Sequence, residues 1–409
     1  RTKVTSRPEA SHPWDVYLNY SRNDQGEFFT WESADRPYEV KPAELGDRSV
    51  GTNVLSGATI TPLARSATLL RISPFLNWNE NHNYFHDNED WHRATKAGAN
   101  VLLSVLPESG AHGLTFGVDG AYTTVRSSFL GSPGITDLAA VVQDEIRLGN
   151  RVRGTVGARL DYHSATGGSP ETTVNPKVSL VVTPSDRVSL RGSLARGYRA
   201  PSAIEQFVST IQYGIRVIPN PDLVGEQAWS AEIGATAVMS QRVRVDGALF
   251  QSAYDNLIGP AGAPGQVLVF QFQNVAEARV RGFDVGGRAN LVRNFADLQL
   301  SYLFLDSEDL ATGKELPYRS RHNLTGSLEL FRHRLGVDYR YRSRVEEVLA
   351  YPADPRTSIS ILDVRGSVDA LGVTFQAKVS NIFNTFYTDV QERSPGAPRS
   401  IGLTVSSTF

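Results

Sequence analysis

Residues 151–162 read RVRGTVGARLDY, and this segment decides the fold class because apolar and charged side chains alternate along it. Val152 and Val156 fall on one side of an extended chain, whereas Arg153 and Arg159 fall on the other. Successive side chains of a β-strand point to opposite faces of the sheet. The segment therefore predicts a strand with one apolar face and one charged face.

The same alternation recurs along the chain, in segments 241–250, 297–304, 334–342 and 372–380. These segments run to about nine to twelve residues, the length that a tilted strand needs to cross the hydrocarbon layer of a membrane. Several of their polar faces carry three or more charges, which a packed soluble core would not tolerate but the lumen of a barrel does. The pattern predicts an all-β transmembrane barrel in preference to a soluble sandwich.

In such a barrel the apolar face meets lipid and the charged face lines the lumen. We expect six apolar side chains to point outward, and these are Val152, Val156, Leu335, Val337, Leu403 and Val405. Four basic side chains are expected to point inward, and these are Arg153, Arg159, Arg340 and Lys378. If instead the six apolar residues were buried in a protein core, the membrane assignment would be wrong.

The connections between strands alternate between short and long. Short links are expected near residues 183–186, 239–240, 332–333 and 369–370. Long polar links are expected at 24–50, 77–93, 196–227, 252–277, 306–319, 345–358 and 381–399. Bacterial barrels have short periplasmic turns and long external loops. The alternation therefore predicts an antiparallel up-and-down barrel, with about 18 strands between Trp14 and Phe409.

Composition limits the alternatives. The 409 residues carry 41 basic and 43 acidic side chains, for a net charge of −2, so no basic face favours nucleic acid. No cysteine and one methionine are present, which excludes thiolate sites and disfavours a soft copper site. No apolar run approaches the ~20 residues of a spanning helix.

Several motifs in the second half occur in the order typical of one family. They are VVQDEIRLGNRVRGTVGARLDYH (141–163), NPKVSLVVTPSDRVSLRGSLARGYRAPSAIEQF (175–207), NPDLVGEQAWSAEIG (220–234), YDNLI (254–258), QNVAEARVRGFDVGG (273–287), LPYRSRHNLTGS (316–327) and VSNIFNTFY (379–387). The chain ends IGLTVSSTF, similar to the assembly signal of outer-membrane barrels. Together these motifs resemble the TonB-dependent receptors of the bacterial outer membrane.

The resemblance implies more than the sequence contains. It implies a barrel of 22 strands, an N-terminal plug, and a short box that binds TonB. None of these N-terminal parts is visible, so residues 1–409 are expected to be the barrel domain of a larger protein, with the plug and the first strands absent. Implied partners are TonB, the lipid bilayer, lipopolysaccharide, and a small-molecule or metal-chelate substrate.

The family signature positions flank the longest external link. They are Arg199, Pro201, Asn220, Pro221, Leu223 and Glu226, together with the C-terminal Phe409. We expect the motifs themselves to fix the geometry of the loop rather than to bind ligand. In haem-uptake members of the family the loop between them carries a histidine that ligates iron, and residues 202–219 contain none, which argues against haem.

Candidate ligand-binding residues are polar and aromatic side chains of the external links. They are Trp78, Tyr84, Trp91, Glu205, Gln206, Tyr213, Arg216 and Tyr254. Aromatic and arginine side chains provide large contact areas and dominate many binding sites. We expect Trp78, Tyr84, Tyr213, Arg216 and Tyr254 to point towards the barrel axis.

Metal ligation and catalysis have weaker support. Segment 77–93 holds His82, His86 and His92 among acidic residues, but without a fixed ligand spacing an ordinary solvated loop is favoured. The acidic residues of 306–309 lack the spacing of a calcium loop. No nucleophile elbow or metalloprotease motif is present, so we expect no enzyme, no resident metal and no cofactor.

The favoured function is uptake of a scarce substrate, such as a ferric siderophore or cobalamin, by an outer-membrane receptor that TonB energises. Two alternatives remain. One is a passive porin-like channel, and the other is a structural or adhesive surface barrel. A plug-like segment with a TonB box upstream of Arg1 would separate the first function from these two.

Overall fold

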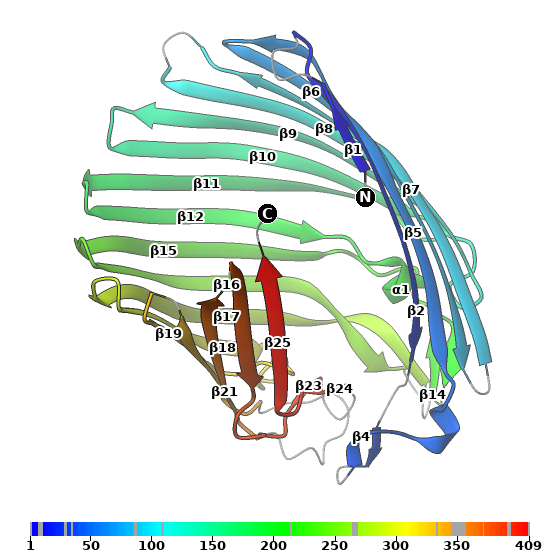
Figure 1. The fold of residues 1–409 in the computed structure, drawn as a ribbon. Coiled ribbons are helices and arrows are strands. Elements are labelled where there is room, and N and C mark those ends of the chain that lie inside the picture. The colour runs from blue at the N-terminus through cyan, green and yellow to red at the C-terminus, as the bar shows by residue number, and fades with distance from the viewer. Residues whose placement is uncertain are drawn as a thin grey trace.

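The computed structural model describes residues 2–6, 11–27, 31–33, 36–85, 88–107, 110–212, 215–263, 269–332, 334–345, 357–370, 372–390 and 394–407. Nearly all of these residues lie in β-strands of one curved sheet (Figure 1). No helix of the described part is long and apolar enough to cross a membrane.

The wall of the barrel is a succession of long strands. In chain order they are β1 (Thr2–Thr5), β2 (Trp14–Gly26), β5 (Arg48–Arg65), β6 (Thr68–Phe85), β7 (Asn88–Val105), β8 (His112–Ser127), β9 (Gly134–Leu148), β10 (Val152–Ala165), β11 (Glu171–Ser185), β12 (Val188–Arg199), β15 (Glu226–Ser240), β16 (Val243–Gly262), β17 (Val269–Val292), β18 (Ala296–Asp309), β19 (His322–Leu330), β20 (Leu335–Arg342), β21 (Ile359–Ala370), β22 (Val373–Ser380) and β25 (Ser400–Ser407).

The smaller elements lie in the connections. They are β3 (Trp31–Ser33), β4 (Arg36–Val40), a 3₁₀ turn at Pro42–Glu44, helix α1 (Ala203–Phe207), β13 (Thr210–Gln212), β14 (Ile215–Ile218), β23 (Thr388–Val390) and β24 (Ser394–Pro395). Only β13 and β14 join the large sheet; β3 pairs with β4, and β23 pairs with β24.

Each wall strand pairs antiparallel with its neighbour along the wall, from β1 to β25. Without β1, β13 and β14, the described 21-stranded sheet has 18 strands from Trp14 onward, the number predicted. The antiparallel up-and-down order predicted for the strands is also confirmed in the described residues. Within the described residues no ladder joins β25 to β1 or β2, so β1 and β25 form the two edges of the sheet.

Two of the predicted external loops are wrong. Residues 77–93 belong to β6 and β7, which pair down to Phe85 and Asn88. Most of 252–277 likewise belongs to β16 and β17, which pair as far as Gly262 and Phe270. Both segments are polar because these strands extend beyond the apolar band, where side chains on both faces meet water. The polar composition of these segments therefore predicted loops, although backbone hydrogen bonds continue the strands through them.

Strand β10 shows how the two faces of the wall differ. Val156 and Leu160 are 51% and 46% exposed although both are apolar. Between them on the opposite face, Arg159 forms ion pairs with Asp119 at 2.6 Å and with Asp161 at 2.7 Å. This inversion of burial is what a bilayer outside and a polar lumen inside require. We call these sides the outer face and the inner face.

The predicted orientations agree with this alternation. Val156, Leu403 and Val405 are exposed, and Val152, Leu335 and Val337 are half-buried between their neighbours, so none of the six is in a core. On the inner face, Lys378 lies 3.4 Å from Asp363 of the adjacent strand, and Arg159 joins the pairs described above. Arg153 and Arg340 are exposed at positions that alternate with the apolar set.

Candidate functional site

The connection from β12 to β15 folds into a compact structure at the external end of the wall. Pro201 is buried, and Ser202 caps helix α1 by accepting a hydrogen bond from Glu205 N at 3.3 Å. Glu205 in turn accepts from Ser202 N at 2.7 Å, which completes a capping box. A capping box satisfies two backbone donors that the first turn of a helix leaves free. The proline and the cap together stop the strand and start a single helical turn.

Arg199, the last residue of β12, binds both sides of this connection. Its guanidinium donates to both carboxylate oxygens of Glu205, at 3.0 and 3.1 Å, and to Glu226 at 2.6 Å. Burial alone would raise the pKa of Glu205, but the hydrogen bonds from Arg199 and Ser202 outweigh it and hold the pKa below its usual value. Glu226 also accepts from Ile258 N at 2.8 Å. The three side chains therefore tie the start of the connection to its end and to β16.

The middle of the connection is bonded to the β16–β17 hairpin. Strand β14 pairs in parallel with β17, and Arg216 stands opposite Val269. Asn220 Nδ2 donates to Phe272 O at 2.8 Å, and Asn274 Nδ2 donates to Val224 O at 2.9 Å. Asparagine serves here because one amide can both donate to and accept from a backbone.

The underside of the connection packs against the inner face of β7 and β8. Val208 is buried with Val125 and Leu130, and Phe207 and Ala94 pack around them. Strands β9, β10 and β11 lie between β8 and β12 in the sheet, so the connection crosses inside the mouth of the barrel (Figure 1).

The crossing is close enough to require a glycine. A Cβ built on Gly168, in the β10–β11 link, would lie 2.6 Å from Pro221 O. Real Cβ atoms do not approach a backbone oxygen so closely, so a larger residue would push the connection away from the wall.

Most of the family signature positions make structural contacts. Arg199 and Glu226 form the ion pairs above, Asn220 binds the neighbouring hairpin, and Leu223 is 5% exposed. Pro201 is buried, and the carbonyl of Pro221 accepts a long bond from Gln206 Nε2 at 3.4 Å. Phe409 lies outside the described residues.

Among the candidate ligand-binding residues, two remain available in the mouth. Arg216 is exposed on β14, and Tyr254 is half-buried on the strand face that carries Asp246 and Ser252. Glu205 is already bound to Arg199, and Gln206 is 3% exposed beneath the connection. Tyr213 lies outside the described residues. Arg216 lies on β14 opposite Val269 of β17, whereas Tyr254 lies on β16 opposite Ala278, nine residues further along β17. The structure therefore places both residues at the β16–β17 hairpin but at different heights.

The expectation that Trp78 and Tyr84 point to the axis is wrong, and Trp91 also faces away from it. Trp78 and Tyr84 share a face of β6 with the exposed Leu76, and Trp91 pairs across the strands with His82 on that face. The alternation of a strand continues above the membrane, so the face that meets lipid below stays outside above. Had these residues been in a loop, as expected, they would have been free to turn inward.

The inner face carries a polar network that was not singled out from the sequence. Asp119 accepts from Asn100 and Arg159, and Asp161 accepts from Arg159 and from Asn175 at 2.8 Å. A second group joins Lys96, Asp137 and His163. The Arg-x-Asp at 159–161 was the available signal. Its partners could not be chosen without the register of β8 to β11.

Neither metal candidate is supported by the described residues, which contain no cluster of three potential protein ligands. His86 lies outside that part, and His82 bonds to Glu80 at 2.9 Å. Asp306 and Glu308 pair with Arg281 and Arg279 of β17, at 2.9 and 2.6 Å. The acidic segment therefore forms cross-strand ion pairs.

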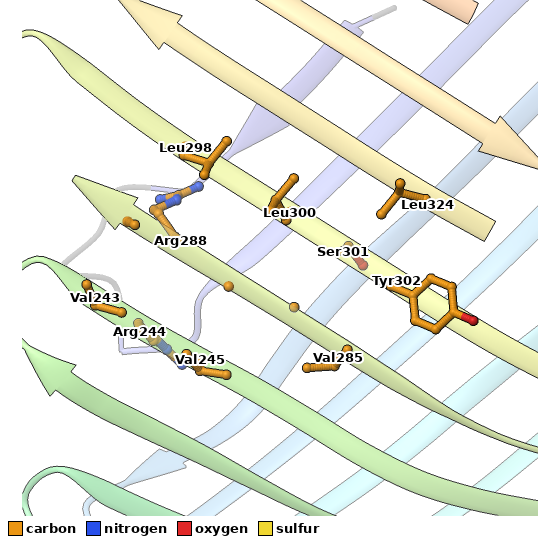
Figure 2. Close-up of a pocket in the computed structure, with 13 residues that line it drawn as sticks. Val243, Arg244, Val245, Val285, Arg288, Leu298, Leu300, Ser301, Tyr302 and Leu324 are labelled. Atoms are coloured by element: carbon orange, nitrogen blue, oxygen red, sulfur yellow. The ribbon is translucent and has the colours of Figure 1, made fainter. Parts of the chain in front are cut away.

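An apolar hollow of about 410 Å³ lies on the wall between β16 and β19. Figure 2 shows Leu300 and Tyr302 of β18 on the same side as Leu324 of β19, with Ser301 on the other side. Because Leu300 and Val285 are exposed apolar residues of the outer face, the hollow opens towards lipid and is not a ligand site of the lumen.

Comparisons with known proteins agree with this architecture. Residues 5–382 match the model of the family described as TonB dependent receptor-like, beta-barrel. No curated protein matches. The chain is similar to the FrpB iron transporter of Neisseria meningitidis, with 15% identity and a TM-score of 0.75 over 98% of this chain and 70% of that one.

Two further solved structures show the same likeness. The ferric-catecholate import receptor Fiu of Escherichia coli K12 is 14% identical, with a TM-score of 0.74 over 98% of this chain and 73% of its own. The siderophore receptor PirA of Acinetobacter baumannii is 12% identical, with a TM-score of 0.76 over 100% of this chain and 70% of its own. At these identities the likeness shows the fold, and the family match shows the membership. The chain belongs to the TonB-dependent receptor family of the bacterial outer membrane, and residues 5–382 match the β-barrel of that family.

Proposed function

We propose that this barrel takes up a ferric siderophore or a similarly sized chelate, such as cobalamin, with energy transmitted by TonB. One observation carries the proposal: the β12–β15 connection folds inside the mouth and presents Arg216 at the outer end of the β16–β17 hairpin, which carries Tyr254 nearer the wall. A receptor for a dilute substrate gains contact area with few side-chain rotors to order.

The solved structures similar to this chain support the substrate class, since their names describe iron, ferric-catecholate and siderophore receptors. Ferric siderophores with catecholate or hydroxamate ligands are bulky and present oxygen-rich surfaces. An exposed arginine and a tyrosine recognise such surfaces by charge-assisted hydrogen bonds and by stacking.

We further propose that residues 1–409 work as the barrel domain of a protein with an N-terminal plug and additional strands. An unpaired strand edge inside a bilayer is costly because lipid offers no hydrogen-bond partner. The unpaired edges at β1 and β25 support strands that lie between them in the assembled wall. TonB, the bilayer and lipopolysaccharide are the partners that membership of the family implies.

The test is uptake of a radiolabelled metal, iron in ferric siderophores and cobalt in cobalamin, by cells that express the full-length gene and lack their own siderophore and cobalamin receptors. A panel of ferric siderophores and cobalamin is supplied with and without functional TonB. We expect accumulation of one substrate class that stops when TonB is removed. Uptake that continues without TonB would contradict active transport and favour a porin-like channel.

A further inference from the structure

The outer face of β6 to β8 is graded from apolar to charged towards the external end. Side chains that face each other across neighbouring strands form rows, and successive rows on one face lie about 7 Å apart along the strand. Ile72, Val101 and Val118 form an apolar row. Three rows further out, Trp78 lies level with Tyr20 of β2 through Val54. Aromatic residues in such positions mark the headgroup level of a bilayer.

The next row outward is charged and unbalanced. Glu80 stands opposite Arg93, and Arg93 stands opposite Arg126. Arg93 Nη2 lies 2.7 Å from Glu80 Oε2, which neutralises one cation. Within the described part of the chain no carboxylate pairs with Arg126. Like charges directly opposite in a sheet are destabilising, so this row retains a positive charge for which the wall provides no counter-ion.

A hollow of about 370 Å³ lies in front of the two arginines. Its other walls are Tyr122, Thr124 and the β8–β9 connection at Ser132, so hydroxyl groups complete a set of hydrogen-bond donors without any carboxylate. Gly134 leaves room for the tyrosine ring, because a Cβ there would lie 2.5 Å from Tyr122 OH. Arginine and hydroxyl donors around a small hollow suit a phosphate group.

Two other cations at the external end of the outer face have counter-ions, since Arg279 pairs with Glu308 and Arg281 pairs with Asp306. Arg22, in the same row as Arg93, has no carboxylate partner among the described residues, but it stands beside Thr52 and does not line the hollow. What distinguishes Arg93 and Arg126 is that an unmatched charge coincides with the hollow.

We propose that the hollow between Arg93, Arg126 and Tyr122 binds the phosphate of a lipid headgroup in the external leaflet. The level of the hollow in the membrane favours a lipid phosphate over free phosphate. The hollow lies one row outside Trp78, and the apolar rows below it accommodate acyl chains. The inference depends on the outer-membrane location of the barrel and not on the transported substrate. In that leaflet the phosphorylated lipid is the lipid A part of lipopolysaccharide.

The experiment titrates the detergent-purified full-length receptor with lipid A and with enzymatically dephosphorylated lipid A, and counts bound lipids by native mass spectrometry. The variants are Arg126→Gln and, as the matched control, Arg22→Gln. Arg22 lies in the same outer-face row, on β2, next to Thr52, and is exposed. It therefore reproduces the change of charge at the same depth without touching the hollow.

We expect R126Q to weaken lipid A binding about tenfold, the loss of one charge-assisted contact. R22Q should stay within about twofold of the parent. Equal binding of the dephosphorylated lipid, or an equal loss in R22Q, would overturn the proposal. Inorganic phosphate that displaces lipid A at micromolar concentration would instead make the hollow a free-anion site. Siderophore uptake by R126Q is measured in parallel, so failure of this site is distinguishable from failure of the transport function.

Discussion

The β12–β15 connection and the β6–β7 hairpin both looked like ligand-facing loops, and they fold differently. In the first, Pro201 and the capping box at Ser202 end the strand, and Arg199 then holds the chain across the mouth. In the second, the alternation continues without a breaker from Trp78 to Phe85, and the strands extend outward. A polar segment turns into the mouth of a barrel only where the sequence first interrupts the ladder.

Replacing Arg199 by methionine should have the largest effect on this contrast. Glu205 and Glu226 would lose their common partner in a half-buried site, and we expect the local stability of the connection to fall by about 2 kcal/mol. Hydrogen exchange of residues 202–224 would then rise about 30-fold. R199K is the control, because lysine keeps the charge but cannot reproduce the two-sided contact. Unchanged protection in R199M would show that packing under Val208 suffices.

Ligand affinity should also distinguish the β12–β15 connection from the β6–β7 hairpin, by a smaller factor than hydrogen exchange does. We expect the double variant Tyr213→Ala, Arg216→Ala to bind the substrate about tenfold more weakly, if together the two contribute about 1.4 kcal/mol. The matched variant Trp78→Ala, Tyr84→Ala removes two aromatic side chains from the outer face and should bind as the parent does. Titration of whole cells with labelled substrate measures both. A loss in the second variant alone would move the site to the outside of the hairpin.

Acid should open the connection before it affects the hairpin. The pKa of Glu205 lies below its usual value, so its ion pair stabilises the fold above the ordinary glutamate range and is lost as the pH falls through the lowered pKa. Protection of 202–224 should therefore decline below about pH 4, where an ordinary glutamate begins to be protonated. Glu205→Gln keeps the capping box and should abolish this pH dependence. Persistence of the decline in E205Q would assign it to another carboxylate.

The fold was largely predictable because a membrane wall repeats one simple pattern. Alternation at Val156, Arg159 and Leu160 gave the strand, its two faces and its place in a meander, and four of the short links were expected close to observed turns. The strand ends were less predictable. Above the apolar band both faces are polar, so composition no longer distinguishes a strand from a loop, and the 77–93 segment was assigned wrongly.

The site was predictable in part. The sequence identified the connection and its signature positions, whereas the ligand-binding role of Arg216 stays a prediction. The orientation of Trp78 depended on a strand that had been taken for a loop. The inner polar network and the row of Glu80, Arg93 and Arg126 join residues from separate strands. Their neighbours follow from the register, which is fixed by hydrogen bonding over the whole wall and not by any short segment.

The parallel pairing of β14 with β17 makes the β12–β15 connection, which lies inside the mouth, part of the sheet. The connection cannot move alone, because displacement must first break the bonds around Arg216 and Val269 and those of Asn220. Such an opening is a cooperative local unfolding step, slower than the nanosecond to microsecond motion of a free loop. If substrate must pass this connection, the observed rate of substrate capture will level off as the substrate concentration rises. The maximum rate will equal the rate at which the connection opens. The hydrogen bonds between β14 and β17 would then set the maximum rate of substrate capture by the receptor.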